Sequence, residues 1–386
     1  MKVICDRSAL LDGINLISGV TASRTPRAQL TCVRLSAEKV DGAGQLVLSG
    51  TDGELSLSIT LDRVDVEHGG DALIPADKLR QIVGAEDADA TLTIEADADS
   101  ATIRGQDAYF KVLGYPPQDF PTIPTYLETA RNARSAFEHT AGPLTELIGR
   151  TLFCAARENT RYAINGVLFK RDGKRLELVA TDGRRLAMAR TGLSASDKDG
   201  GATQCIVPSK ALGILQKVAQ IDDEPIHIAI GDNLAIFALG ADAENPRATL
   251  SSTLVEGQFP PYEDVIPRDQ DKTIVFDRDV MASAVRRSAL LTNEESRGVE
   301  FAFTAEEKQL QLSSRAPEMG EARITIDLAE YKGDDITIGF NPHYIADALK
   351  VIDESAITFE LRAANKPGVV RLANDFLYVV MPVNLP

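Results

Sequence analysis

Hydrophobic and polar positions form a pattern that recurs three times along the chain. Each third contains an apolar stretch with helical spacing, a run of alternating residues typical of β-strands, a second helical stretch and a closing set of strands. The alternating runs centre on Leu48, Leu178 and Leu312, which lie 130 and 134 positions apart in the chain of 386 residues. This period predicts one fold of about 129 residues used three times in tandem, close to the usual size of a domain.

Helices are expected at two places in every unit, where apolar residues recur three and four positions apart. The first helices are expected over residues 6–20, 143–154 and 277–290. The second helices are expected to begin at Pro75, Pro208 and Pro342. Proline suits the first position of a helix because its missing N–H would have no partner there.

Strands between and after the helices show period-two alternation, as at Leu55, Leu57 and Ile59 with polar residues between them. Two helices packed on one face of an antiparallel sheet account for each unit, so the expected fold class is α+β. Polar or proline-rich joins near Pro124 and Pro267 separate the units. The expected domains are residues 1–128, 129–268 and 269–386.

The composition is that of an acidic globular protein. Apolar residues make up 44% of the chain and charged residues 25%, which are ordinary values. The formal net charge of −16 argues on average against nucleic-acid binding, but a basic surface can coexist with acid elsewhere. The sequence shows no signal peptide and no apolar run long enough to cross a bilayer, so we expect a cytoplasmic protein without membrane association.

Candidate catalytic and metal-binding residues do not cluster in the sequence. The four histidines are scattered, and phosphate-loop, dinucleotide-binding and hydrolase motifs are absent. The four cysteines form no C-x-x-C pair, as expected of reduced structural thiols. The acidic clusters Glu86–Asp87 and Asp222–Glu224 are expected to be solvated, and the Thr-Asp-Gly triplets at 51–53 and 181–183 to be turns. We therefore expect no enzyme activity, no cofactor and no metal.

Basic residues recur on the polar faces of the expected helices. On any one helix they fit an ordinary solvated face, but their recurrence in an acidic chain favours a shared basic surface. They are Arg7, Lys78, Arg80, Arg150, Lys210, Lys217, Arg286, Arg287 and Lys350. Arg24, Arg27 and Arg34 extend this set near the end of the first helix.

Several strings in the chain are specific enough to compare with those of a known family. The most specific are Thr181-Asp182-Gly183-Arg184-Arg185-Leu186-Ala187 and the ending Tyr378-Val379-Val380-Met381-Pro382. Others are Met1-Lys2-Val3, Arg161 to Phe169, Gly257-Gln258-Phe259-Pro260, Arg297-Gly298-Val299 and Gly339-Phe340-Asn341. In their order along the whole chain, the strings resemble those of the β subunit of bacterial DNA polymerase III, the sliding-clamp family.

The resemblance implies a non-catalytic processivity factor of the replicative polymerase, a head-to-tail homodimer closed as a ring around double-stranded DNA. Two helices in each of six units make twelve. At about 10 Å between axes they form a ring about 38 Å across with about 28 Å free inside, which is wider than a duplex. Contacts to phosphates alone would let such a ring slide without reading sequence. Further implied partners are an ATP-dependent clamp loader, the polymerase catalytic subunit and other clamp-motif proteins.

The resemblance also assigns site residues. A partner peptide is implied to bind between the second and third domains, in a pocket with apolar walls and a few polar groups. Its lining is implied to be Ile164, Thr181, Gly183, Arg184, Arg185, Leu186, Pro260, Val265, Asn341, Tyr344, Val379, Met381, Pro382 and Val383. The DNA-facing residues are expected to be Arg24, Lys78, Arg80, Arg150, Lys210, Lys217 and Arg287. The dimer interface is expected to join Phe110 and Val112 to Leu290 and Leu291 of a second copy.

Two other classes of protein remain as alternatives. An enzyme built from tandem α+β units would need titratable residues grouped in one cleft, and the sequence groups none. A peptide-binding scaffold with the same fold would need no common basic layer on its helices. The placement of the basic residues therefore discriminates between a scaffold and a clamp.

Overall fold

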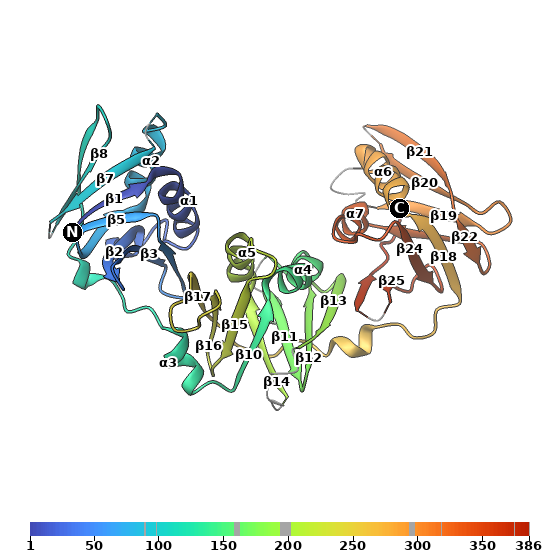
Figure 1. Ribbon diagram of the computed structural model, residues 1–386. Helices are drawn as coiled ribbons and strands as arrows, with labels where there is room; N and C mark the ends of the chain where they lie inside the picture. Colours follow the sequence, from blue (N-terminus) through green and yellow to red (C-terminus); the bar gives the residue numbers. More distant parts are fainter. Residues whose placement is uncertain are drawn as a thin grey trace. The chain divides into compact units, whose positions relative to one another are not determined.

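The computed structural model describes residues 1–88, 90–97, 99–157, 163–193, 202–292, 298–317, 319–373 and 375–385 (Figure 1). Arg161, Tyr162 and Arg297, which belong to the strings quoted above, lie outside the described residues. The chain separates into two compact units. The first contains Met1–Thr145 and Leu193–Leu254, and the second contains Glu146–Gly192 and Val255–Pro386. The middle third of the chain therefore contributes to both units.

The two helices expected in each third of the chain are present. The α-helices of the described residues are α1 Arg7–Ser18, α2 Ala76–Ala85, α3 Tyr126–Arg131, α4 Ala141–Leu152, α5 Ser209–Val218, α6 Arg278–Ser288 and α7 Pro342–Lys350. The 3₁₀ helices are η1 Ala28–Thr31, η2 Pro117–Asp119, η3 Tyr262–Val265 and η4 Ala289–Leu291. The short helix α3 lies at a join between repeats and is additional to the expected set.

The expected start of the second helices is correct for one proline and wrong for the other two. Pro342 is the first residue of α7, because Asn341 precedes it as the N-cap and accepts a hydrogen bond from the His343 N–H at 2.9 Å. Pro75 and Pro208 instead end strands, with ψ angles of 121° and 141°, and are themselves the N-cap residues of α2 and α5. Strand pairing therefore holds these two prolines outside the helix.

The first unit contains two antiparallel sheets. The strands of these two sheets are β1 Lys2–Asp6, β2 Cys32–Val40, β3 Ala43–Thr51, β4 Leu55–Leu61, β5 Val64–His68, β6 Gly70–Pro75, β7 Thr91–Ala96, β8 Ser100–Arg104, β9 Tyr109–Leu113, β10 Ser135–Thr140, β15 Pro225–Ile230, β16 Leu234–Leu239 and β17 Ala248–Thr253. A further strand, β14 Thr203–Pro208, belongs to neither of these sheets. One sheet has the order β5-β1-β7-β8-β9 and the other β10-β15-β16-β17-β4-β3-β2-β6. In the second sheet Leu250 of β17 lies opposite Leu57 of β4, so this pair of strands joins the first repeat to the second.

The second unit repeats this plan. Its strands are β11 Gly166–Asp172, β12 Arg175–Thr181, β13 Arg185–Gly192, β18 Lys272–Asp277, β19 Val299–Thr304, β20 Gln309–Ala316, β21 Gly320–Asp327, β22 Glu330–Lys332, β23 Ile336–Phe340, β24 Ala356–Leu361, β25 Gly368–Leu372 and β26 Phe376–Val380. One sheet has the order β21-β20-β19-β23, and the other continues from β11-β12-β13 into β26-β25-β24-β18-β22. The antiparallel pair β13 and β26 joins the second repeat to the third.

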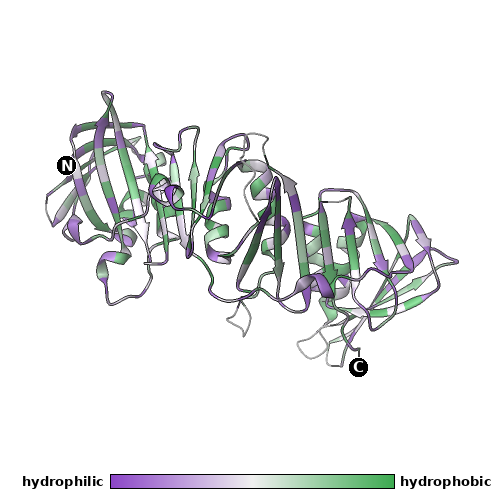
Figure 2. Cartoon of the chain, turned by 90° about the horizontal axis from the view of Figure 1, so that it is seen from below, coloured by the Kyte–Doolittle hydropathy of each residue, from purple (hydrophilic) through white to green (hydrophobic). Residues whose placement is uncertain are grey.

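Apolar faces of helices and strands form the core, as the pattern predicts. Leu10, Ile14 and Ile17 of α1 are fully buried, and α1 packs against α2 and the strands β3 and β4. In the second unit α6 packs against α7 (Figure 1). Hydrophilic and hydrophobic positions alternate along the strands (Figure 2), and Leu55 and Leu57 of β4 are buried. Burial of this apolar surface is the main stabilising term.

The expectation of reduced structural cysteines is confirmed, whereas the expectation that the Asp222–Glu224 cluster is solvated is wrong. All four cysteines are free and buried, and burial raises the pKa of the Cys5 thiol to about 12. The Asp222–Glu224 cluster is not wholly solvated, because Glu224 is buried and forms a two-pronged ion pair with Arg247 at 2.8 and 2.7 Å. The Arg247 partner lies 23 residues along the chain, which a local pattern does not reveal.

This ion pair generates a stability prediction. Arg247→Ala should lower the free energy of unfolding by about 1–3 kcal/mol, because it leaves the Glu224 carboxylate buried without its partner. The measurement is urea denaturation followed by circular dichroism. Arg323→Ala is the control, because its contact with Glu321 is 3.7 Å long and exposed, and it should change stability by less than about 0.5 kcal/mol. Equal losses in the two variants would contradict the account.

Candidate functional site

The turn between β12 and β13 is built by the side chains of the second Thr-Asp-Gly triplet. The Thr181 hydroxyl donates to the Arg185 carbonyl at 2.7 Å and accepts from the Gly183 N–H at 3.1 Å. Asp182 accepts from the Arg184 and Arg185 N–H groups at 2.9 and 3.0 Å. Gly183 has a φ of +84°, which favours glycine. The turn at 51–53 has the same hydrogen bonds, so both triplets are turns as expected.

Arg185 emerges from this turn and links three elements of the second unit. Its guanidinium donates to Asp182, to Asp347 of α7 at 2.9 Å, and to the Phe153 carbonyl just after α4 at 2.9 Å. It also lies 4.5 Å from the centre of the Tyr344 ring. The Arg185 side chain is only 10% exposed, so its charge is stabilised by these partners rather than by water.

Asp347 shows the effect of this arrangement on a neighbouring carboxylate. Burial alone would raise its pKa, but hydrogen bonds from Arg185 and Lys350 outweigh burial and lower it. The carboxylate is therefore ionised at neutral pH and holds α7 to the turn. Sequence reasoning missed Asp347 because it lies 162 residues from Arg185; the available signal was a lone acid on the polar face of the expected helix.

The C-terminal tail lies against the same turn. Strand β26 pairs with β13, and beyond it the Met381 N–H donates to the Arg184 carbonyl at 2.9 Å. Two residues later the Val383 N–H donates to the Gly339 carbonyl at 2.9 Å, beside the start of α7. These bonds bring together Thr181–Leu186, Tyr344 and the tail, which is most of the implied peptide pocket.

The remaining implied residues differ in exposure. Ile164, Leu186 and Val379 are buried, so their side chains present little surface to a partner. Val265 and Met381 are 52% and 42% exposed, which leaves two apolar side chains available to a partner. Asn341 is buried as the cap of α7. Pro260, Pro382 and Val383 are partly exposed.

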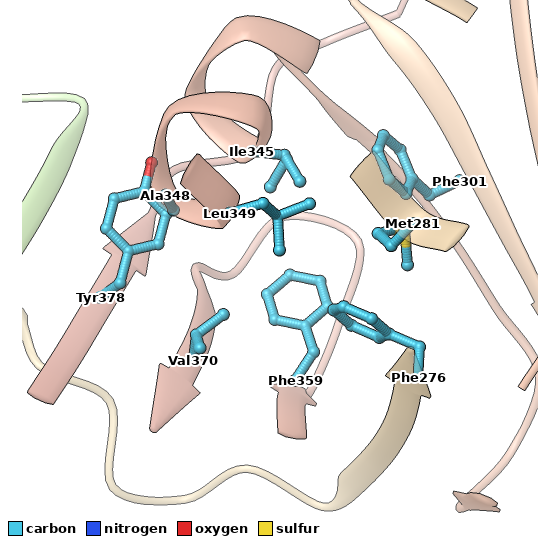
Figure 3. A pocket seen from close by; sticks show the side chains of 9 residues that line it. All are labelled: Phe276, Met281, Phe301, Ile345, Ala348, Leu349, Phe359, Val370 and Tyr378. Carbon is cyan, nitrogen blue, oxygen red and sulfur yellow. The ribbon is translucent and has the colours of Figure 1, made fainter. Parts of the chain in front are cut away.

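A small apolar cavity lies on the other side of α7 (Figure 3). Ile345, Ala348 and Leu349 of this helix face Phe359 and five further apolar and aromatic residues around a void of about 10 Å³. The lining presents no polar surface, so the void is an imperfection of the core and offers no partner to a polar ligand.

The expected DNA-facing residues are mostly exposed. Six of the seven have exposed side chains: Arg24, Lys78, Arg80, Lys210, Lys217 and Arg287. Some are already engaged, since Lys210 lies 2.6 Å from Asp52 and Arg80 lies 3.8 Å from Asp77. Among the described residues no ion pair is formed by Arg24, Lys78 or Lys217, whose ammonium and guanidinium groups are available to an external anion.

Arg150 differs from the other basic residues. Its side chain is only 15% exposed and lies 2.9 Å from Glu146 and 3.8 Å from Glu354. The guanidinium also lies 5.9 Å from the centre of the Phe376 ring. These contacts hold the end of α4 to its neighbours, so Arg150 has a structural role whether or not it meets DNA.

The residues expected at the dimer interface lie at sheet and helix ends. Strand β9, with Phe110 and Val112, is the last strand of its sheet in the first unit. Leu290 in η4 of the second unit is 69% exposed, while Leu291 is partly covered. An edge strand with unpaired backbone groups and an exposed leucine are both surfaces that a second chain can cover.

The described part of the chain contains no candidate metal centre. No group of three or more potential metal-ligating residues is found there. Within the same residues, no helix is both long and apolar enough to cross a membrane. The site offers an anchored turn, a docked tail and exposed apolar side chains, which are features that a peptide-binding site can use.

The tandem α+β repeats, joined by the β17–β4 pair within the first unit and by the β13–β26 pair within the second, are typical of a clamp-like class of protein, and family models identify it. Residues 1–124, 140–261 and 263–384 match the N-terminal, central and C-terminal domains of the DNA polymerase III beta subunit. The chain belongs to this family, that of the beta sliding clamps. Its function is that of a processivity clamp for DNA polymerase III, a role that is not enzymatic.

Individual relatives cover the whole chain. It is 33% identical over 387 residues to the beta sliding clamp of Pseudomonas aeruginosa, with all of both chains aligned. A crystal structure of a sliding clamp from the same organism bound to griselimycin has a TM-score of 0.88 at 32% identity, covering 100% of both chains. The sliding clamp of Bacillus subtilis also has a TM-score of 0.88, at 25% identity with full coverage of both chains.

The docked tail generates a prediction at Gly339. A Cβ atom at this position would lie 2.5 Å from the Val383 carbonyl oxygen and 2.8 Å from a Leu385 side-chain carbon, so Gly339→Ala should displace the tail. Hydrogen exchange of the Val383 amide should become faster, with little change elsewhere in the unit. Gly213→Ala in α5 is the control, because nothing lies within 4 Å of its added Cβ, and it should leave tail exchange unchanged. A tail that stays protected in Gly339→Ala would refute the packing described.

Proposed function

We propose that two copies of this chain close head to tail into a ring around duplex DNA, and that partners dock on it through the site at the β12–β13 turn. The observation that supports this best is the match of three successive family domains along one chain. The proposed domains are residues 1–128, 129–268 and 269–386. The proposed partners are the replicative polymerase catalytic subunit, an ATP-dependent loader and other proteins with the same docking peptide. The proposed place of action is the cytoplasm.

Two sheet edges support the head-to-tail dimer. Strand β9 ends one sheet of the first unit, and β21 ends one sheet of the second, with η4 packed beside it. Tyr109 and Leu113 of β9 are 58% and 75% exposed, as is much of Leu290. The two edges belong to different units of the chain, so a contact between them is heterologous. Such contacts form a closed ring of two chains when two copies together complete a full rotation.

The dimer prediction concerns η4. Leu290→Ala with Leu291→Ala should give monomers, because the proposed dimer would bury both leucines at each interface and truncating a buried leucine costs about 2–5 kcal/mol. Light scattering should then report 41.6 kDa in place of twice that mass. Leu127→Ala is the matched control, an exposed leucine on α3 that should leave the dimer intact. A double variant that keeps the doubled mass would sink the proposed interface.

The exposed basic residues support a surface that tolerates phosphates. The chain has a net charge of −16, yet the helices α2 and α5 present Lys78, Arg80, Lys210 and Lys217 to solvent. Contacts to phosphate alone fix no sequence, which suits a protein that must move along DNA. This basic layer favours the clamp over a scaffold without DNA.

The charge prediction uses Arg24, Lys78 and Lys217, three of the basic residues that form no ion pair with another described residue. Changing Arg24, Lys78 and Lys217 together to Glu should weaken binding to linear duplex. The same change should make the slope of log K against log salt concentration less steep, by about 0.9 for each phosphate that the protein no longer neutralises. Fluorescence anisotropy at several salt concentrations measures both. The dimer mass should not change.

A matched triple reversal separates position from net charge. Lys39, Arg131 and Lys366 are exposed and lie outside the basic set, so changing them to Glu alters the net charge equally. This control should keep most of the salt dependence. If both triple variants lost it to the same extent, net charge and not the helix surface would explain the binding.

The peptide prediction concerns the tail. Removing residues 381–386 should abolish binding of a fluorescent Gln-x-x-Leu-Phe peptide and stimulation of the polymerase, because it removes Met381 and the backbone bonds to Arg184 and Gly339. Intact protein should bind with a Kd of about micromolar, as suits partners that exchange. The truncated protein should keep the doubled mass. Peptide binding of equal strength in truncated and intact protein would rule out this pocket.

A further inference from the structure

A row of charged residues crosses three neighbouring strands of the second unit. Lys170 of β11 lies opposite Glu177 of β12, which in turn lies opposite Arg190 of β13. The Arg190 guanidinium donates to one Glu177 oxygen at 2.5 Å, and the Glu177 side chain is only 9% exposed. A buried carboxylate is costly unless both of its oxygens have partners.

The second Glu177 oxygen is satisfied by a residue far along the chain. Tyr262, the first residue of η3, is buried and donates its hydroxyl to this oxygen at 2.5 Å. Its ring packs edge-on against Phe259, with 6.1 Å between ring centres. Burial alone would raise the pKa of Glu177, but hydrogen bonds from Tyr262 and Arg190 outweigh it and lower the pKa. The Tyr262 hydroxyl is therefore one of the groups that keep Glu177 ionised.

Lys170 of this charged row also contacts Glu263, the residue after Tyr262 in η3. The Lys170 ammonium lies 3.1 Å from the Glu263 carboxylate and 5.9 Å from the centre of the Tyr262 ring. Helix η3 spans only Tyr262–Val265, and Tyr262 is its one buried residue. A four-residue helix with one buried side chain has little core of its own, so its place on the sheet depends on these contacts.

Helix η3 ends at Val265, an exposed apolar residue of the implied peptide pocket. We propose that Tyr262 and Glu177 are positioning residues for partner binding, which fix η3 so that Val265 stands ready as one wall of that pocket. The inference rests on the proposed function, since it concerns the same peptide site. A wall fixed in advance loses less entropy when a peptide docks, so loss of the buried hydrogen bond between Tyr262 and Glu177 should weaken peptide binding.

The direct test is Tyr262→Phe, which removes one hydroxyl and keeps the ring. The dissociation constant of the fluorescent Gln-x-x-Leu-Phe peptide should rise about five- to tenfold, the effect of one hydrogen bond. Tyr331→Phe is the matched control, because Tyr331 is a buried tyrosine of the same unit whose hydroxyl donates to the Asp334 carbonyl. It should lose similar thermal stability and leave the peptide affinity unchanged. An unchanged affinity in Tyr262→Phe, or an equal loss in both variants, would overturn the inference.

A double-mutant cycle tests whether Tyr262 acts through Val265. In a Val265→Ala background, Tyr262→Phe should change the dissociation constant by less than about twofold, because the wall it positions is gone. If Tyr262→Phe raised the dissociation constant by the same factor with and without Val265→Ala, the positioning role would be overturned. If Tyr262→Phe fails to fold, Glu177→Gln takes its place, since the amide keeps an oxygen acceptor and should give a smaller loss that also vanishes beside Val265→Ala. If the unchanged protein binds no peptide, the proposed function is refuted as well. If the unchanged protein binds the peptide and Tyr262→Phe binds it equally well, only this inference is refuted.

Discussion

One nearly buried guanidinium, that of Arg185, holds the candidate peptide site together. A charge removed from water needs partners on every side, and Arg185 has the Asp347 carboxylate, the Asp182 carboxylate and the Phe153 carbonyl. These three partners belong to α7, the β12–β13 turn and the chain just after α4. Because all three must stay in place to satisfy one side chain, the turn, the helix and the C-terminal tail beside them are fixed relative to one another within the second unit.

Strand pairing supplies the frame in which this is possible. Strands β13 and β26 pair with Leu186 opposite Val379, so the second and third repeats share one sheet of the second unit. The β17–β4 pair does the same for the first and second repeats in the first unit. The two joins differ in what surrounds the shared turn. At the second join Arg185 and the tail are present, whereas at the first join Asp52 meets Lys210 instead.

The repeat, the helices and the turns were predictable from the sequence because they depend on residues close together in the chain. Period-two alternation around Leu57 and the Thr-Asp-Gly triplets determine strands and turns locally. The ion pairs of Arg185 with Asp347 and of Arg247 with Glu224 were not predictable, because their partners meet only through the fold. For the same reason Pro75 was placed in a helix, although pairing with Cys32 of β2 keeps it in a strand.

The acidic composition of the chain is compatible with DNA association because of where its basic residues lie. Lys78 and Lys217, which form no ion pair with another described residue, lie on α2 and α5, and a phosphate contact needs only a local field. The central claim is that the grip on DNA is topological. It is tested by loading the dimer onto nicked circular DNA with a clamp loader and ATP, and then cutting the circle. The account predicts protein retained on the circle and released after linearisation, whereas equal retention on both forms would contradict it.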